Sequence, residues 1–257
     1  MTASSPRVLV TNDDGIDSPG LAALAQCSVD LGWHTVIAAP AEEASGTSAG
    51  LTAAAADRHV MVQRRELPGL RGVEAYAVAA HPAFIVLAAV DEGFGDCPDI
   101  VLSGINRGAN VGRAILHSGT VGAAMTAGLH GARALAVSLD VGLAQQGEAH
   151  WSTAAEVVRR LLPDIARLDQ GCVLNLNVPN TQSLGDDSEP QWATLATYGR
   201  VQSKVTRVGD DAIQLRAVEV DGELEAGTDA ALLAQGRPTV TAIRSIVEDN
   251  TRFGIRG

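Results

Sequence analysis

The sequence has little of what marks several large protein classes. Aromatic residues make up only 3% of its 257 residues, so that Ala, Val and Leu are expected to fill the core. It contains no run of about 18 apolar residues, which argues against a transmembrane helix. Its first residues, MTASSPRVLV, lack the charged and apolar regions of a secretory signal. We therefore expect a cytoplasmic protein that does not associate with a membrane.

Positive charge is also scarce. Lys and Arg number 19 against 30 Asp and Glu, giving a formal net charge of −11, and the basic residues form no cluster. Nucleic-acid polymers and anionic membranes bind to clustered Lys and Arg, so the sequence argues against both partners. A small anionic ligand is still compatible, because loops and helix N-termini bind phosphate without net positive charge.

Several catalytic and redox motifs are absent as well. The three cysteines, Cys27, Cys97 and Cys172, form no CxxC pair; they suit a reducing compartment and the role of small buried apolar residues. The sequence matches the GxSxG pattern at residues 46–50 (GTSAG), but in a predicted loop and not at the strand–turn–helix of a nucleophile elbow, which disfavours a Ser-His-Asp hydrolase. It also lacks HExxH and the GK[ST] ending of a P-loop.

What is present is an alternation of short apolar runs and helical stripes. The opening reads as strand, helix, strand, which implies a crossover, parallel pairing and an α/β fold. Further strands are predicted at residues 58–64, 73–79, 100–103, 134–139 and 173–178, and helices at residues 81–90, 118–129 and 154–168. Residues 104–117 are predicted to be a loop. The pattern predicts a doubly wound, mostly parallel sheet over residues 1–180.

Residues 181–257 have a different character. The runs ATLATY, QSKVTRV and AIQLRAV alternate as antiparallel strands do, TDAALLAQG predicts a short helix, and TVTAIRSI predicts a last strand. With neither an internal repeat nor a low-complexity linker, we treat residues 1–257 as one domain. Its C-terminal part is predicted to be a β-rich extension, partly returning to the core and partly an arm for oligomerisation.

Ligands of open α/β sheets bind where loops leave the carboxyl ends of strands, and three unusual segments are expected there. The first is NDDG, residues 12–15, whose adjacent carboxylates repel each other unless a cation or hydrogen bonds compensate. A hard ion such as Mg²⁺, Mn²⁺ or Ca²⁺ would do so. Taken alone, the tetrapeptide is more typical of a solvated turn. The second segment, around Ser45, Gly46 and Thr47, is by itself more typical of a plain surface loop.

The third segment is VLSGINRGANVGRAILHSGTVGAAMTAG, residues 101–128. Its glycines allow another molecule to approach the main chain, and Asn106 and Asn110 present amide groups suited to a metal or a phosphate. The residues SGT at 118–120 open a predicted helix, whose N–H groups and dipole form an anion site. The small residues GAA that follow favour close packing of the helix on the sheet. A purely structural crossover is the alternative, and His117 is either an acid–base group or a structural residue.

In this order, VTNDDGIDSPG, SGTSAGLT, DIVLSGINRGANVG and HSGTVGAAM closely resemble the SurE family of 5′/3′-nucleotidases. The match continues through ALAVSL, LNLNVP and GTDAALLAQG and so covers most of the chain. The resemblance implies a Rossmann-like αβα core, a C-terminal extension used in a homodimer or homotetramer, and one divalent ion per subunit, Mg²⁺ or Mn²⁺, with Ca²⁺ as a possible substitute. It further implies hydrolysis of nucleoside monophosphates.

The site follows from the same resemblance. The implied metal ligands are Asp13, Asp14, Ser45 and Asn106, of which Asp13, Asp14 and Asn106 are also catalytic. The implied substrate and phosphate contacts are Asn12, Gly46, Asn110, Ser118, Gly119 and Thr120. For the group that orients or deprotonates the attacking water, Asp14 is favoured over Asp13.

Some positions depart from the family pattern. His117 stands where Tyr is usual, and Thr126 stands where Glu is usual. His81 and Phe84 replace Thr and Asp of a GTPADC segment, and PAEEAS lacks the Asp and Arg that often precede the SG loop. These departures leave two alternatives open: a phosphatase acting mainly on polyphosphate or another phosphorylated metabolite, and a catalytically silent nucleotide- or metal-binding regulator.

Overall fold

The structure is a computed structural model that describes residues 5–51, 55–56, 59–142, 147–185, 189–199, 201–208, 212–219, 222–244 and 246–248. The strands are β1 (Arg7–Thr11), β2 (His34–Pro40), β3 (Ala55–Ala56), β4 (His59–Val60), β5 (Val62–Arg65), β6 (Glu74–Val78), β7 (Ile100–Arg107), β8 (Arg133–Asp140), β9 (Val173–Pro179), β10 (Gln191–Trp192), β11 (Val201–Val208), β12 (Ala212–Glu219) and β13 (Thr239–Ile243). The helices are α1 (Pro19–Asp30), α2 (Pro82–Val90), α3 (Gly119–Leu129), α4 (Trp151–Ile165) and α5 (Asp229–Ala234), with a 3₁₀ helix η1 (Gly112–His117).

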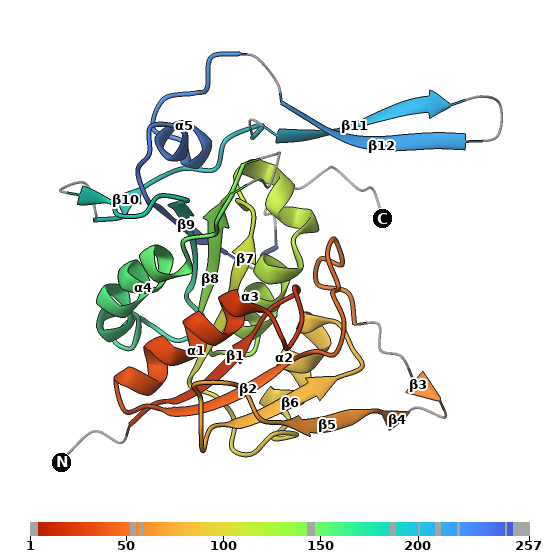
Figure 1. The fold of residues 1–257 in the computed structure, drawn as a ribbon, viewed down its shortest axis with the longest axis vertical. Helices are drawn as coiled ribbons and strands as arrows, with labels where there is room; N and C mark the ends of the chain where they lie inside the picture. Colours follow the sequence, from red (N-terminus) through yellow and green to blue (C-terminus); the bar gives the residue numbers. More distant parts are fainter. Residues whose placement is uncertain are drawn as a thin grey trace, which may run out of the picture.

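Nine of the described strands form one mixed sheet in the order β10-β13-β9-β8-β7-β1-β2-β6-β5 (Figure 1). Strand β1 pairs in parallel with both β2 and β7. From β1 the chain first builds outward through β2 and β6, and then returns to build the other way through β7, β8 and β9. The direction of winding therefore reverses between β1 and β7, where open α/β sheets bind their ligands. The predicted α/β class and mostly parallel sheet are confirmed.

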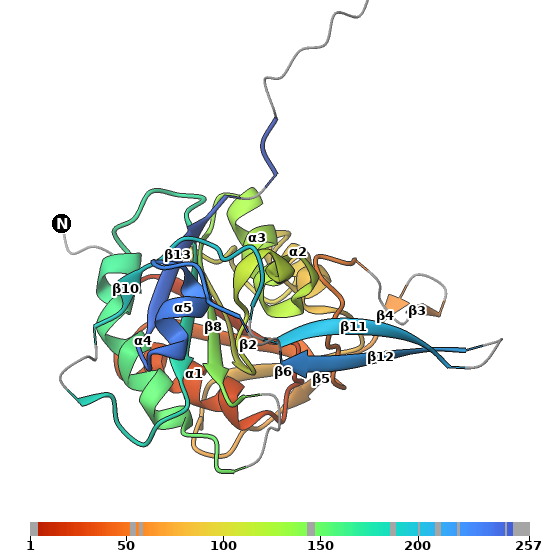
Figure 2. The same ribbon diagram turned by 90° about the horizontal axis from the view of Figure 1, so that it is seen from above.

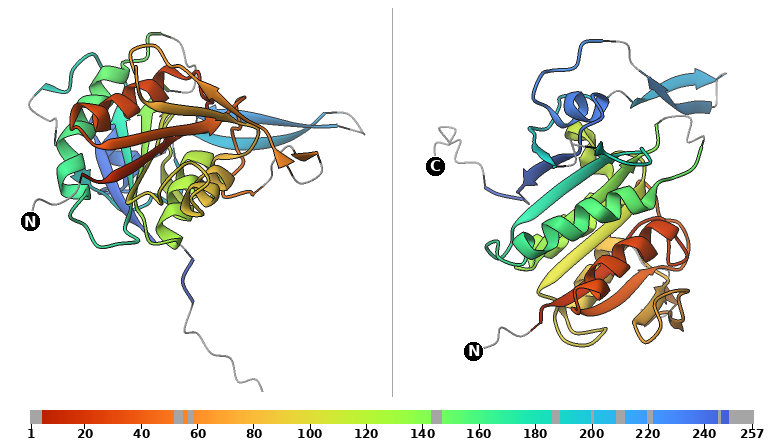
Figure 3. Two further views of the ribbon diagram at one scale, coloured as in Figure 1. Left: turned by 90° about the horizontal axis from the view of Figure 1, so that it is seen from below. Right: turned by 60° about the vertical axis from the view of Figure 1, so that its left-hand side comes forward.

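Helices cover both faces of this sheet. Helices α1 and α4 lie side by side on one face, and α2 and α3 pack together on the other (Figure 3). The first layer buries Leu21 and Leu24 of α1 against Val158 of α4, whereas the second is built from Ile85 of α2 and small residues such as Ala124 of α3. This supports the expectation that aliphatic residues and alanine fill the core. Among the described residues, no helix has the length and apolar character that crossing a membrane requires.

The loop predicted for residues 104–117 is wrong at both of its ends. Strand β7 runs on to Arg107, because pairing with β8 resumes at Asn106 after an irregularity that follows Ser103. Gly104 permits this irregularity: it has a φ of +138°, and a Cβ there would overlap the Val137 carbonyl. Residues 112–117 then form η1, so only the short stretch between β7 and η1 is a loop.

The C-terminal part contains two structurally distinct pieces. Among the described strands, β11 and β12 pair only with each other, antiparallel, and they project from the body of the molecule (Figures 1 and 2). Strand β13 returns to the main sheet and pairs antiparallel with β9. The short helix α5 is confirmed, but the strand predicted for ATLATY is wrong, since only Thr194 forms an isolated bridge there, to Thr228.

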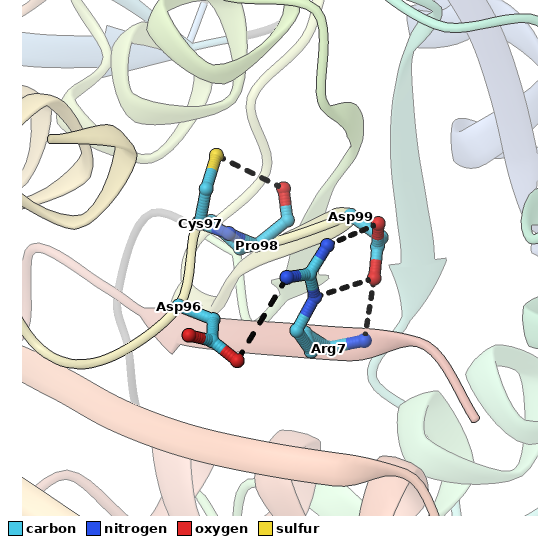
Figure 4. Close-up of polar contacts among 5 residues, drawn as sticks. All are labelled: Arg7, Asp96, Cys97, Pro98 and Asp99. Carbon is cyan, nitrogen blue, oxygen red and sulfur yellow. Dashed lines mark hydrogen bonds and ion pairs between the residues drawn. The ribbon is translucent and has the colours of Figure 1, made fainter. Parts of the chain in front are cut away.

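An ion pair joins β1 to the segment before β7 at the amino end of the sheet (Figure 4). The Arg7 guanidinium donates two hydrogen bonds to Asp99, both of 3.1 Å, and the Arg7 backbone N–H donates a third of 2.9 Å. These bonds and the positive charge of Arg7 lower the pKa of Asp99. The contact fixes β1 against β7 at the edge of the sheet opposite to the carboxyl ends.

Candidate active site

A cleft with a volume of about 430 Å³ opens at the carboxyl ends of β1 and β7. All three segments singled out in the sequence contribute to it. The residues that line it are Asp13, Asp14, Glu43, Ser45, Gly46, Asn106, Arg107, Asn110, Ala114, His117 and Ser118. The cleft therefore lies at the point where the winding of the sheet reverses.

The NDDG turn directly after β1 is held by its own first side chain. The Asn12 Nδ2 donates to the Gly15 carbonyl (3.0 Å), and the Asn12 Oδ1 accepts the Gly15 N–H (3.2 Å). Gly15 has a φ of +99°, a conformation that side chains disfavour. The Ala44 N–H donates to the Asp13 carbonyl (2.7 Å), which docks the SG loop on the turn. Asn12 is fully buried, so it shapes the turn rather than facing the cleft.

Asp13 is held from the opposite side by the first turn of α3. The Thr120 hydroxyl donates to Asp13 Oδ1 (2.5 Å) across 107 residues of sequence. Gly119 leaves the necessary room, since a Cβ there would lie 2.8 Å from Asp13 Oδ2. Burial raises the pKa of Asp13, and the hydrogen bonds from Thr120 partly oppose that rise. The anion beside the first turn of α3 is thus the Asp13 carboxylate itself.

Asp14 is partly buried and lines the cleft. Its Oδ2 accepts the Arg107 backbone N–H at 3.2 Å, which links the turn after β1 to the end of β7. Burial, together with the negative charges of Asp13 and Glu43, raises the pKa of Asp14 to about 6. The charge of Arg107 opposes this rise only weakly. The protein therefore holds two carboxylates close together with only part of their charge compensated, an arrangement that a bound cation stabilises.

The SG loop brings a carboxylate that sequence reasoning did not assign to the site. Glu43 lines the cleft, and its Oε1 accepts a hydrogen bond from the Ser45 hydroxyl (2.7 Å). Behind this loop lies Gly122 of α3, where a Cβ would overlap the main chain of Ser48. Gly122 therefore allows α3 to approach the SG loop, whereas Ala123 and Ala124 belong to the core between α3 and the sheet, as predicted.

Asn106 and Asn110 reach the cleft from the segment after β7. The Asn106 Nδ2 donates to the Gly108 carbonyl (2.7 Å), which leaves its Oδ1 as an acceptor. The Asn110 N–H donates to Asn177 Oδ1 (2.8 Å), and the Asn110 carbonyl accepts 2.8 Å bonds from the side chains of Asn175 and Asn177. The Asn110 Nδ2 donates to the hydroxyl of Ser138 in β8 (2.8 Å). A buried frame of polar side chains on β8 and β9 thus fixes Asn110.

This frame was missed in the sequence analysis, where LNLNVP was interpreted as an ordinary buried strand. The signal was available: two Asn residues at alternate positions of such a strand need hydrogen-bond partners in the interior. Both are fully buried in the structure.

The donor set suits a hard divalent ion. Asp13, Asp14, Ser45 and Asn106 all line the same cleft and offer carboxylate, hydroxyl and amide oxygens, the ligands that Mg²⁺, Mn²⁺ and Ca²⁺ prefer. Over the residues that the structure describes, no group of three or more His, Cys, Asp or Glu forms a metal cluster. Binding would therefore depend on the neutral oxygens of Ser45 and Asn106 as well as on the two aspartates.

The six predicted phosphate contacts divide into two groups. Gly46, Asn110 and Ser118 line the cleft. Asn12, Gly119 and Thr120 are not among its lining residues: Asn12 bonds within the NDDG turn, and Gly119 and Thr120 lie beside the Asp13 carboxylate.

The positions that depart from the family pattern divide in a similar way. His117 lines the cleft, whereas His81, Phe84 and Thr126 are not among its lining residues. The His81 Nδ1 is buried and has no hydrogen-bond partner among the described residues. The Thr126 hydroxyl donates to the Gly122 carbonyl within α3 (2.8 Å). His130 is exposed at the far end of α3.

Comparison with known proteins agrees with this architecture. A profile described as "Survival protein SurE" matches residues 8–210. The chain belongs to the SurE family. A relative named 5′-nucleotidase SurE from Methylobacterium radiotolerans is 31% identical over 262 residues, covering 96% of this chain and 97% of the relative. Another 5′-nucleotidase SurE, from Moorella thermoacetica, is 36% identical over 245 residues, covering 92% and 89%.

A solved SurE structure shows the same fold. The crystal structure of the SurE protein from Aquifex aeolicus aligns with a TM-score of 0.74 at 26% sequence identity, covering 93% of each chain. The resemblance to SurE inferred from the sequence motifs, and the fold that it implied, are therefore confirmed.

Proposed function

We propose that this SurE-family chain is a metal-dependent phosphomonoesterase that hydrolyses nucleoside 5′- and 3′-monophosphates to nucleoside and phosphate. The observation that carries the proposal is the meeting of Asp13, Asp14, Ser45 and Asn106 in one open cleft at the reversal point of the sheet. The activity in the names of the relatives, 5′-nucleotidase, supports it.

The four oxygen-bearing residues would hold one divalent ion, Mg²⁺ or Mn²⁺, with Ca²⁺ as a substitute. Such an ion supplies a Lewis acid that polarises a phosphate oxygen and offsets negative charge as the phosphorus–oxygen bond breaks. Asp13 is the more rigid ligand, because Thr120 and the NDDG turn fix it. Asn12, Gly119 and Thr120 hold the aspartates in place instead of contacting phosphate.

The chain supplies the remaining chemistry. Asp14, at the open side of the pair, orients a water molecule and accepts its proton at a carboxylate oxygen as the water attacks phosphorus. Gly46, Asn110 and Ser118 lie around the same cleft and bind the phosphate oxygens. Because the frame on β8 and β9 already holds Asn110, little reorganisation is needed when charge develops on those oxygens.

The extension over residues 181–257 is proposed to assemble the chain into a homodimer or homotetramer. The support is the β11–β12 pair, which projects from the body and has no other described strand beside it. An isolated two-stranded sheet is marginally stable in water, and its open edges favour pairing with a further chain. We place the protein in the cytoplasm, in keeping with its unpaired cysteines.

A substrate panel tests the function. Purified protein should release phosphate from AMP and GMP in the presence of Mn²⁺ or Mg²⁺, and a chelator should abolish the release. Asp14→Asn should lose nearly all activity but keep its fold by circular dichroism. Faster release from short polyphosphate than from any nucleotide would replace the proposed substrate. Nucleotide binding by calorimetry without turnover, under every metal tested, would refute the enzymatic proposal in favour of a silent binding protein.

A further inference from the structure

The C-terminal extension reaches back to the cleft through one buried carboxylate. Asp229, the first residue of α5, is fully buried, and its Oδ2 accepts the Gly112 N–H at 2.8 Å across 117 residues of sequence. Its Oδ1 accepts the N–H groups of Ala196 (2.9 Å) and Ala230 (2.8 Å). Figure 1 shows α5 at the end of the sheet where β7 and β8 finish. One side chain thus joins three segments that are distant in sequence.

The contact lies at the start of η1, whose residues form one wall of the cleft. Ala114 and His117 of η1 and Ser118 directly after it line the cleft, and Asn110 precedes Gly112 by two residues. Gly112 has a φ of +63°, and a Cβ there would lie 2.8 Å from the Ala196 carbonyl. The Arg113 N–H donates to the same carbonyl (3.0 Å). The beginning of η1 is therefore pressed against residue 196 and fixed there by hydrogen bonds on both sides.

Further hydrogen bonds hold the start of α5 against residue 194. The Asp229 N–H donates to the Thr194 carbonyl (2.9 Å), and the Thr194 N–H donates to the Gly227 carbonyl (3.2 Å). Burying a carboxylate is unfavourable unless hydrogen bonds compensate it, and the hydrogen bonds that Asp229 accepts from three N–H groups provide that compensation. A residue serving only the cap of α5 would not need the bonds to Gly112 and Ala196, since Thr228 already caps the helix by accepting the Ala231 N–H.

We propose that Asp229 is a positioning residue for substrate phosphate: it sets the place of η1, and with it the phosphate-binding wall formed by Asn110 and Ser118. The inference rests on the proposed phosphatase function. Asp229 does not touch the cleft, and the metal-ligand set of Asp13, Asp14, Ser45 and Asn106 does not include any residue of η1. Loosening Asp229 should therefore weaken phosphate binding while the affinity for the metal stays unchanged.

Asp229→Asn tests this selectively. The amide keeps a single acceptor oxygen, and the orientation that preserves the two bonds to Ala196 and Ala230 turns the NH₂ group toward the Gly112 N–H. The Asn NH₂ group and the Gly112 N–H, both donors, then face each other, and the hydrogen bond to η1 is lost. We expect faster hydrogen exchange at the Gly112 and Arg113 amides, and a rise of about tenfold to a hundredfold in the KM for AMP and in the inhibition constant of inorganic phosphate. Calorimetric Mn²⁺ affinity should match the wild type.

Thr228→Ala is the matched control. It removes the cap of the same helix and leaves the three bonds to Asp229 in place, so it should lower stability without changing the KM or phosphate inhibition. Gly112→Ala is the second variant, used if Asp229→Asn does not fold: its Cβ disturbs the same contact from the η1 side and should reproduce the phosphate-specific defect.

Two results would overturn the proposal. One is a folded Asp229→Asn protein, less stable but with wild-type KM and phosphate inhibition, which would make Asp229 a structural residue only. The other is an equal loss of Mn²⁺ and phosphate affinity, which would mean that the variant disturbs the whole cleft. If the wild type proves to have no phosphatase activity, the proposed function fails first. Calorimetric binding of inorganic phosphate to the Mn²⁺-loaded variants then still decides the role of Asp229.

Discussion

Replacing Gly119 with alanine should displace the Asp13 carboxylate. The new Cβ would lie 2.8 Å from Asp13 Oδ2, 3.0 Å from Asp13 Cβ and 3.1 Å from the Thr47 hydroxyl. An ordinary contact begins near 3.4 Å, so the carboxylate oxygen must move by about 0.6 Å. Asp13 is buried beside the first turn of α3, so the shift changes the geometry of the proposed metal ligands.

The expected effect on function is large, and the effect on stability is small. A misplacement of about 1 Å costs about a hundredfold in rate, so we expect kcat/KM to fall by about tenfold to a hundredfold. Mg²⁺, which demands near-ideal octahedral geometry, should lose more affinity than Mn²⁺. Alanine gains up to about 1 kcal/mol in helix propensity, whereas overpacking costs about 1–3 kcal/mol, which leaves a net loss of stability of about 0–3 kcal/mol.

Calorimetric titration with Mn²⁺ at neutral pH, followed by phosphate-release kinetics at saturating metal, measures both effects. Gly128→Ala is the matched control in the same helix: its Cβ meets the Val173 side chain and the Gly171 carbonyl, remote from the cleft, so it should lower stability only. A folded Gly119→Ala protein with wild-type metal affinity and kcat/KM would show that Asp13 is not a metal ligand.

Four further predictions follow from the contacts and the pKa shifts. Because the pKa of Asp14 is about 6 in the metal-free fold, the Mn²⁺ affinity measured by calorimetry should fall by up to about tenfold per pH unit below 6. Because the pKa of Asp14 is raised in the fold, its contribution to stability is lost as the pH rises from about 4 to about 6. Above pH 6, the free energy of unfolding of metal-free Asp14→Asn, measured in urea, should therefore exceed that of the wild type by about 1–3 kcal/mol. Equal free energies of unfolding would contradict the raised pKa. Asn177→Ala removes both bonds to Asn110 and should cost about 2 kcal/mol of stability and raise the KM for AMP; an unchanged KM would show that Asn110 does not contact substrate. Asp99→Asn weakens the ion pair with Arg7 at the opposite end of the sheet and should leave kcat and KM unchanged, with only a small drop in the midpoint of thermal unfolding.

The parts of the fold that could be predicted from sequence are those set by local patterns. The predicted opening of strand, helix and strand is present as β1, α1 and β2. The stretch over residues 104–117 could not be predicted in this way. Its strand ending depends on the main chain of β8 beside Gly104, and η1 depends on the contact of Gly112 with residue 196. Both partners are distant in sequence, so the local sequence pattern does not predict these contacts.

The same distinction applies to the candidate site. The four expected metal ligands could be brought to one cleft from the rule that parallel strands present their carboxyl ends together. What the rule could not supply was the orientation of α3. Thr120 was expected to bind phosphate at the N-terminus of its helix, but in the structure its hydroxyl donates a hydrogen bond to Asp13. Glu43 and Asp229 were not predicted, because their roles depend on which backbone groups surround them in three dimensions.

The bond between Thr120 and Asp13 has a thermodynamic consequence. The two residues are 107 positions apart, so a fragment that ends before α3 contains the four proposed metal ligands but lacks the hydroxyl that fixes Asp13. An ion that binds only the assembled native chain stabilises it by mass action, by about 2.7 kcal/mol at a hundred times its dissociation constant. The melting temperature should therefore rise with metal concentration. Measured over a series of metal concentrations, it reports the occupancy of this site without any substrate.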